Sequence, residues 1–146
     1  MVDAENMVGT PSVTAEAGKE LLSQLEEACA TFKGAHKVIA QSHFAARKAA
    51  FAFLGLRQIW RSGTDGADWA LINVLANESV ECRFTHVTIC SGDGIFAEVA
   101  AWLSSHGVHV TVLVGRGLLS ARLALAAHEV IYLDDELNNS NYGEAA

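Results

Sequence analysis

The stretch HVTICSGDGIFAEVAAWLSSHGVHVTVLV, residues 86–114, is the clearest indication of the fold class. Two short runs rich in valine, isoleucine and threonine, at 86–91 and 109–114, flank a segment whose apolar residues recur at helical spacing. The helix between them is expected to stop at Gly107, because glycine readily adopts the left-handed conformation common at helix C-termini. A unit of strand, helix and strand is typical of parallel strands joined by a crossover helix.

The rest of the chain repeats this alternation. Further strands are expected at 37–42, 57–62 and 129–133. A first strand is expected at Val2, where only two residues precede Asp3, so this strand is either short or has earlier residues upstream. Alternating strands and helices predict an α/β protein, a Rossmann-like three-layer sandwich with a central parallel sheet and helices on both faces.

Helices are expected between these strands. The first is expected to begin at Thr10 and Pro11, a capping residue followed by a residue suited to the first turn. The last is expected to bury Leu123 and Leu125. The predicted helical segments after the first are 44–55, 65–77, 96–107 and 120–128.

Composition and charge restrict the class of protein. The 146 residues are 51% apolar with one proline, which is typical of a single folded domain, expected over 1–133 with a polar, acidic tail at 134–146. No apolar run approaches the roughly 20 residues that span a bilayer, and the first residues lack a signal-peptide pattern, so we expect a cytoplasmic protein with no membrane partner. The net charge of −7 argues against a general nucleic-acid binder. Residues 43–63 nevertheless contain four basic residues and no acid, which is compatible with a local basic surface.

Three aspartates map to one edge of the expected sheet. Right-handed crossovers bring the carboxyl ends of parallel strands to the same edge, where ligands bind. Asp3 ends the first strand, Asp93 follows the fourth in a Ser-Gly-Asp-Gly turn, and Asp68 lies in the first turns of the helix after the third. Carboxylates in one pocket repel each other, and a divalent cation removes this cost. Oxygen ligands favour Mg²⁺ or Mn²⁺, which can activate water for phosphodiester hydrolysis.

Each aspartate also has an ordinary structural explanation. Asp93 can cap the following helix, and Asp68 with Asp65 can favour the positive end of its own helix. Asp3 can be a solvated terminal residue. Their joint position at one edge favours a shared site over three unrelated roles.

Four segments together resemble the NYN domain, a branch of the PIN-like metal-dependent ribonucleases. They cover essentially the whole chain in the family's order, and SGDG followed by an aromatic residue is the most specific piece. The resemblance implies a PIN-like fold with a mostly parallel sheet of order 3-2-1-4-5 and a further edge strand. The segments are VDAEN at 2–6, GADWALINVLA at 66–76, VTICSGDGIFAEVAAWLSSHGVHVTVL at 87–113 and LSARLALAAHEVIYL at 119–133.

The resemblance also implies roles for individual residues. Asp3, Asp68 and Asp93 would be the catalytic acids that bind Mg²⁺ or Mn²⁺. Asn6 would be the polar residue near the scissile phosphate, and Ser91 would help to shape the site.

One position departs from the family pattern. The family usually reads Ser-Gly-Asp-x-Asp-Phe, and this chain has Ile95 in place of the second acid. Magnesium is often held by only one or two protein carboxylates, so hydrolysis with one metal ion is compatible with this loss. Glu98, one helical turn further on, is a candidate replacement, but the sequence favours the alternative that it is a solvated helix residue.

Basic residues at the same edge are candidates for binding RNA. Arg61 follows the third strand and Arg116 lies in VGRG after the fifth, so both are expected to contact phosphates. His43 and the basic residues after it are weaker candidates. Trp69, beside Asp68, is a candidate for stacking on a base, with core packing as the ordinary alternative.

The leading hypothesis is a cytoplasmic, divalent-metal-dependent endoribonuclease that cuts single-stranded or loop RNA, with a homodimer left open. The alternative is an NYN-like module that has lost catalysis and binds RNA or protein, as Ile95 and the acidic net charge favour. A phosphatase or nucleotide-binding domain is a third hypothesis. It is disfavoured because the sequence has no GxGxxG or P-loop motif, and VDAEN lacks the second acid of an Asp-x-Asp phosphatase.

Overall fold

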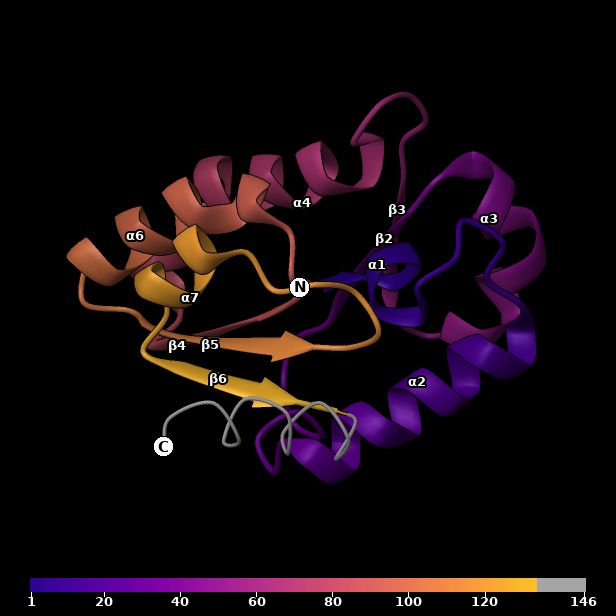
Figure 1. Cartoon of the computed structure of the whole chain (residues 1–146), viewed down its shortest axis with the longest axis horizontal. Coiled ribbons are helices and arrows are strands. Elements are labelled where there is room, and N and C mark those ends of the chain that lie inside the picture. The colour runs from indigo at the N-terminus through magenta and orange to yellow at the C-terminus, as the bar shows by residue number, and fades with distance from the viewer. Residues whose placement is uncertain (134–146) are drawn as a thin grey trace, which may run out of the picture.

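The computed structural model describes residues 1–133, and these form three layers with a sheet in the middle (Figure 1). The predicted tail at 134–146 lies outside the described residues. The strands are β1 (Val2–Asp3), β2 (Val38–Gln41), β3 (Arg57–Trp60), β4 (His86–Cys90), β5 (His109–Val114) and β6 (Glu129–Tyr132). The α-helices are α1 (Ala4–Val8), α2 (Ala15–Ala28), α3 (His43–Ala49), α4 (Gly66–Asn77), α5 (Val80–Arg83), α6 (Ala97–Ser105) and α7 (Ala121–Ala126), and two 3-10 helices are η1 (Ala50–Phe53) and η2 (Gly94–Phe96).

All six strands are parallel, in the order β3-β2-β1-β4-β5-β6. This confirms the predicted α/β sandwich, its strand order and its additional edge strand. Although β1 has only two residues, it lies in the centre of the sheet: Val2 is opposite Ile39 on one side and Cys90 on the other. The amide N–H of Cys90 also donates to the carbonyl of Met1 at 2.8 Å. Asp3 therefore starts from a backbone fixed on both sides.

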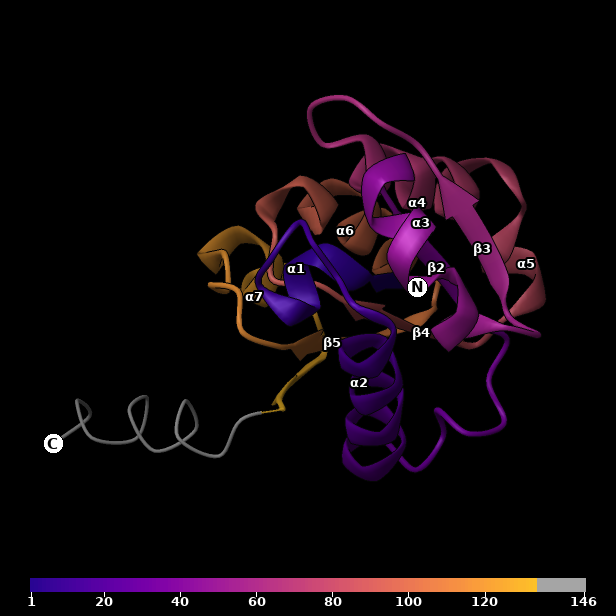
Figure 2. The ribbon, with the colours of Figure 1, turned by 90° about the vertical axis from the view of Figure 1, so that its right-hand side faces the viewer.

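Alternate strand residues face opposite helical layers. Val2, Cys90 and Leu113 are buried against α1, α2, α3 and η1. A second set of buried strand residues, which includes Ile89 and Val112, packs with α4, α6 and α7. Figure 1 and Figure 2, the latter seen from the side where α3 and β3 lie, show α4 and α6 above the sheet and α2 below it. Because successive strand residues point to opposite faces, Asp3 faces the layer that contains α4.

The predicted start of the first helix was wrong. The structure has a separate five-residue helix, α1, that ends at Gly9 with a φ of 78°. The next helix, α2, begins at Ala15, and the Thr14 hydroxyl accepts from the N–H of Ala17 at 3.1 Å. Thr10 instead accepts from the N–H of Ser12 within a turn. Thr10 and Thr14 are both of a residue type preferred at the N-cap of a helix, so residue type alone did not show which of them begins α2.

The predicted burial of Leu125 was also wrong. Leu123 is fully buried, whereas Leu125 is 89% exposed. Two residues that are two positions apart lie on opposite sides of an α-helix, and α7 packs against α6 and η2 through the side that carries Leu123. No helix in the described part of the chain has the length and apolar character needed to cross a membrane.

Candidate functional site

A cleft of about 410 Å³ opens at the carboxyl ends of the central strands. Asp3 at the end of β1, Asp68 in α4 and Asp93 before η2 all line it. Asn6 and Arg61 line it as well. The structure thus brings five of the predicted site residues to one cavity.

Asp3 is buried and held by hydrogen bonds on both carboxylate oxygens. Its Oδ1 accepts from the N–H of Asn6 at 3.2 Å, which caps α1. Its Oδ2 accepts from the hydroxyl of Ser91 at 3.3 Å, and the Ser91 oxygen itself accepts from the N–H of Asp93 at 3.2 Å. Ser91, fully buried, therefore links Asp3 to the Ser-Gly-Asp-Gly turn.

Asp68 lacks such support. It is 8% exposed, and no donor in the described residues reaches its buried Oδ1. The pKa of Asp68 is raised to about 8, chiefly by burial and then by a hydrogen bond shared with the Asp3 carboxyl group and by the negative charges of Asp3, Asp93 and Asp65. Burial also raises the pKa of Asp3, against the opposing effect of its hydrogen bonds. Asp3 and Asp68 are thus an acid pair that holds a proton at neutral pH.

The acid pair has the chemistry of a hard-cation site. A proton and a divalent cation relieve the same repulsion, so either can occupy the space between two carboxylates. Among residues 1–133 no three His, Cys, Asp or Glu side chains are grouped closely enough to hold an ion. A bound Mg²⁺ or Mn²⁺ would therefore take two protein carboxylates, Asp3 and Asp68, and complete its shell with water and substrate oxygens, which is usual for Mg²⁺.

Asp93 has two roles in the geometry. Its Oδ1 accepts from the N–H of Ile95 at 3.0 Å and so caps η2, as the structural alternative predicts. Its side chain also lines the cleft, and its negative charge contributes to the raised pKa of Asp68. Ile95, the departure from the family pattern, does not line the cleft and packs against the apolar core instead.

The turn that carries Asp93 is clamped to α1. The amide N–H of Gly92 donates to the Oδ1 of Asn6 at 3.0 Å. A side chain at position 92 is excluded, because a Cβ atom there would lie 2.3 Å from the carbonyl oxygen of Leu118. Asn6, predicted as a polar residue near the phosphate, thus positions the turn through its amide oxygen.

The two predicted phosphate-binding arginines lie in different cavities. Arg61, directly after β3, lines the carboxylate cleft. Arg116 lines a separate cavity of about 100 Å³ beside α1 and α2, because its N–H donates to the carbonyl of Met7 and so draws the loop after β5 toward α1. The expectation that both arginines face the acids therefore holds for Arg61 only. Glu98, the suggested replacement acid, is also outside the cleft and forms an exposed ion pair with Arg122.

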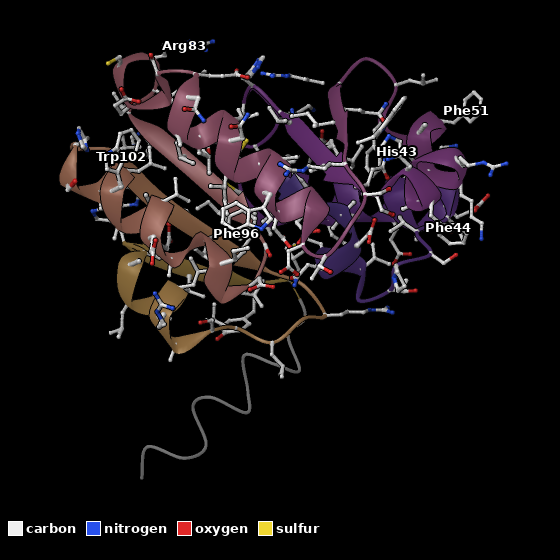
Figure 3. The ribbon with its side chains drawn as sticks, turned by 90° about the horizontal axis from the view of Figure 1, so that it is seen from above. His43, Phe44, Phe51, Arg83, Phe96 and Trp102 are labelled. Atoms are coloured by element: carbon white, nitrogen blue, oxygen red, sulfur yellow. The ribbon has the colours of Figure 1, made fainter. Side chains whose placement is uncertain are left out.

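The sequence interpretation missed two acids of the cleft. Glu5 lines it, and its Oε1 accepts from the N–H of Ser42 at 2.6 Å, which joins α1 to the end of β2. Its place in VDAEN was a signal for this role. Asp65 lines the cleft from a left-handed backbone with a φ of 54°. The ring of His43, labelled in Figure 3 at the start of α3, forms a hydrogen bond with the hydroxyl of Ser62 at 2.9 Å, beside the loop that enters the cleft.

Comparisons with known protein families, curated proteins and solved structures give no match to this chain. The residues that line the cleft, and their geometry, are therefore the basis for a functional proposal.

Proposed function

We propose that this chain is a divalent-metal-dependent endoribonuclease of the NYN, PIN-like type. It acts on single-stranded or loop RNA, with Mg²⁺ or Mn²⁺ as the cofactor. The reacting phosphodiester lies in the cleft lined by Asp3, Asp68 and Asp93. The resemblance of VDAEN and SGDG to the family supports this assignment together with the geometry of the cleft.

One observation carries the proposal: Asp68 is buried beside Asp3 and has no structural partner for its Oδ1 in the described residues. A buried carboxylate without a cation or donor lowers the stability of the fold. Helix capping explains Asp3 and Asp93, which each accept a backbone N–H, but does not explain Asp68. Such unfavourable placement is typical of functional sites.

The residues of the cleft would each have a separate role in the reaction. Asp3 and Asp68 would hold the ion, and Ser91 fixes the orientation of Asp3. Arg61 would bind a phosphate of the strand, because it is a cation on the lining of an otherwise acidic cleft. When bound, such an ion lowers the pKa of water and stabilises the charge that develops on the phosphodiester.

The test is cleavage of an end-labelled single-stranded RNA with Mn²⁺, with and without EDTA. We expect metal-dependent cleavage by the wild type, a loss of at least about 100-fold in Asp68→Asn and Asp93→Asn, and wild-type rates in Glu98→Gln, which removes an exposed carboxylate outside the cleft. Cleavage that persists in EDTA, or in folded Asp68→Asn, would contradict the proposal.

A second function is favoured by Ile95. With an apolar residue at the family's second acid position, the chain lacks one acid of the family pattern, as expected of an NYN-like module that binds RNA or protein without cutting it. Thermal melting with Mn²⁺ separates the two functions, because a ligand that binds only the folded state raises the Tm. A rise in the wild type supports the ribonuclease, and an unchanged Tm supports the module without catalysis.

A further inference from the structure

A second cavity, of about 400 Å³, lies at the amino ends of the central strands, and it shares no lining residue with the carboxylate cleft. Its walls come from the start of β1, the loop before β2, α5 and the first half of β4. This size is within the range of about 300–1,000 Å³ that is typical of small-molecule sites. The lining residues that carry the argument are Phe32, His36, Lys37, Arg83, Phe84 and His86.

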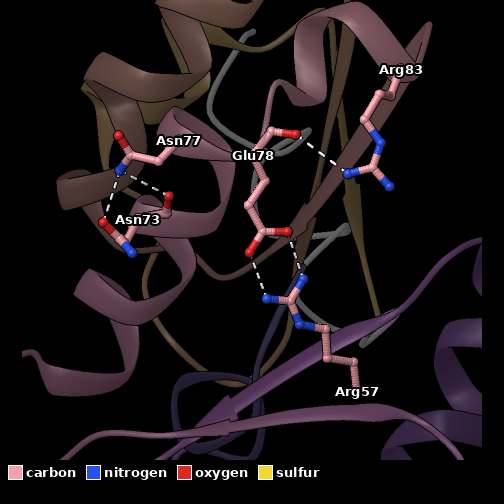
Figure 4. Close-up of polar contacts among 5 residues, drawn as sticks. All are labelled: Arg57, Asn73, Asn77, Glu78 and Arg83. Atoms are coloured by element: carbon pink, nitrogen blue, oxygen red, sulfur yellow. Dashed lines mark hydrogen bonds and ion pairs between the residues drawn. The ribbon is translucent and has the colours of Figure 1, made fainter.

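The charged side chains that line this second cavity, among the described residues, are basic. None of the described residues that line it has a carboxylate, whereas Lys37 and Arg83 are cations and two histidines lie on its rim. The nearby acid Glu78 is already engaged: its two carboxylate oxygens accept from the Arg57 guanidinium, at 2.7 Å in one of the two bonds (Figure 4). Among residues 1–133, Arg83 donates to no carboxylate, and its guanidinium donates to the backbone carbonyl of Glu78 at 3.3 Å. The cationic charge of Arg83 therefore remains available to a ligand.

Flat apolar surfaces lie beside these cations. The Arg83 guanidinium is 5.2 Å from the centroid of the Phe84 ring, and the His36 ring stacks on that ring with centroids 6.2 Å apart. Lys37 Nζ lies 4.9 Å from the centroid of Phe32 and donates to the carbonyl of Lys33 at 3.0 Å. Because packing already restrains both cations, less side-chain entropy is lost when a ligand binds.

We propose that this cavity binds a small organic anion with a flat aromatic body, of the phosphorylated-nucleoside class. The aromatic body would pack on Phe84 and His36, and the anionic group would pair with Arg83 and Lys37. None of the acids that line the carboxylate cleft takes part, so this proposal does not depend on the ribonuclease assignment. Figure 3 shows Arg83 far from His43 and Phe44 on α3, at the other side of the molecule.

The test is a titration of the ¹⁵N-labelled chain with AMP in EDTA, followed by amide chemical shifts. We expect AMP to move the amides of Ala35, Thr85 and Val87, and to bind about tenfold or more tightly than adenosine or inorganic phosphate. Shifts that centre on Asp93 and Gly117, equal affinity for phosphate alone, or no shift up to about 10 mM AMP would overturn the proposal.

Variants locate the site. Arg83→Ala should weaken AMP binding at least about tenfold, and Arg122→Ala, which removes an exposed cation on α7, should leave it within about twofold. The AMP affinity of Lys37→Gln is a second test of the site. It decides the outcome if the amide spectrum of Arg83→Ala shows that this variant is unfolded. Unchanged affinity in a folded Arg83→Ala or Lys37→Gln variant would contradict the site.

Discussion

At the scale of the residue, the account depends on a contrast between three aspartates. Asp3 and Asp93 each accept a backbone N–H, so each stabilises local structure as well as lining the cleft. Asp68 is buried, and no donor among residues 1–133 reaches its Oδ1. Burial, a hydrogen bond shared with the carboxyl group of Asp3 and the neighbouring negative charges together raise its pKa to about 8.

Asp68→Asn should stabilise the metal-free protein. The amide removes a buried negative charge and can donate to Asp3, as the shared proton does. We expect a gain of about 1 kcal/mol at about pH 8, equivalent to a rise in Tm of roughly 4 °C, measured by thermal melting in EDTA. Glu98→Gln, an exposed control, should change stability by less than about 0.5 kcal/mol. A lower Tm in Asp68→Asn would mean that the acid stabilises the fold.

The stability of the wild type should fall as pH rises. The pKa of Asp68 in the folded protein, about 8, is above the ordinary value of 3.8, so the folded state binds more protons than the unfolded state between these pH values. The free energy of unfolding therefore decreases from about pH 4 to about pH 8. Urea unfolding in EDTA should show that the wild type loses stability relative to Asp68→Asn across this range. If the free energies of unfolding of the wild type and Asp68→Asn change with pH in parallel, the pKa of Asp68 is not raised.

The two arginines should differ in RNA binding. Arg61 lines the carboxylate cleft and Arg116 lines another cavity, although both are cations that follow a strand. Filter binding in EDTA, which prevents cleavage, should show affinity several-fold weaker for Arg61→Ala and within about twofold of wild type for Arg116→Ala. A larger loss of RNA affinity in Arg116→Ala than in Arg61→Ala would indicate that the RNA binds on the side of Arg116 instead.

At the scale of the element, the turn between β4 and η2 sets the site. It is fixed by the hydrogen bond from Gly92 N–H to Asn6 and by close contact with the chain at Leu118. The central position of β1 brings Asp3 beside this turn, and the first turn of α4 brings Asp68 over it. Rigid elements thus place side chains that are distant in sequence.

Gly92→Ala should distort this turn. The added methyl group would lie 2.3 Å from a backbone carbonyl oxygen, so the chain must shift. We expect a loss of about 1–3 kcal/mol in urea unfolding. Gly34→Ala is a matched control, because a Cβ atom at Gly34 meets nothing within 4 Å. Equal stability of the two variants would show that the turn adapts freely.

The sequence predicted these elements better than it predicted contacts between side chains. The parallel sheet followed from alternation and crossover handedness, whereas the strand order was implied by the resemblance to the NYN domain. Asp3, Asp68 and Asp93 line one cleft because the carboxyl ends of parallel strands lie at one edge of the sheet. The missing partner of Asp68 was not predictable, since it depends on which donors reach one buried oxygen. Arg116 follows β5 at the predicted edge, but its separate cavity was not predictable because a residue after a strand can turn toward either helical layer.

At the scale of the whole molecule, charge is unevenly distributed. The chain has a net charge of −7, yet it has an acidic cleft at the carboxyl edge of the sheet and a basic cavity at the amino edge. The two cavities share no lining residue. An acidic cleft attracts a cation, so metal binding is the step on which the proposed activity depends.

The most direct test of whether Asp3 and Asp68 bind a divalent cation is calorimetric titration of Mn²⁺ into the wild type and Asp68→Asn at about pH 7, in two buffers of different ionisation enthalpy. We expect the wild type to bind one ion and to release roughly one proton from the acid pair, and Asp68→Asn to lose binding. The absence of Mn²⁺ binding by the wild type, or equal binding by Asp68→Asn, would contradict it.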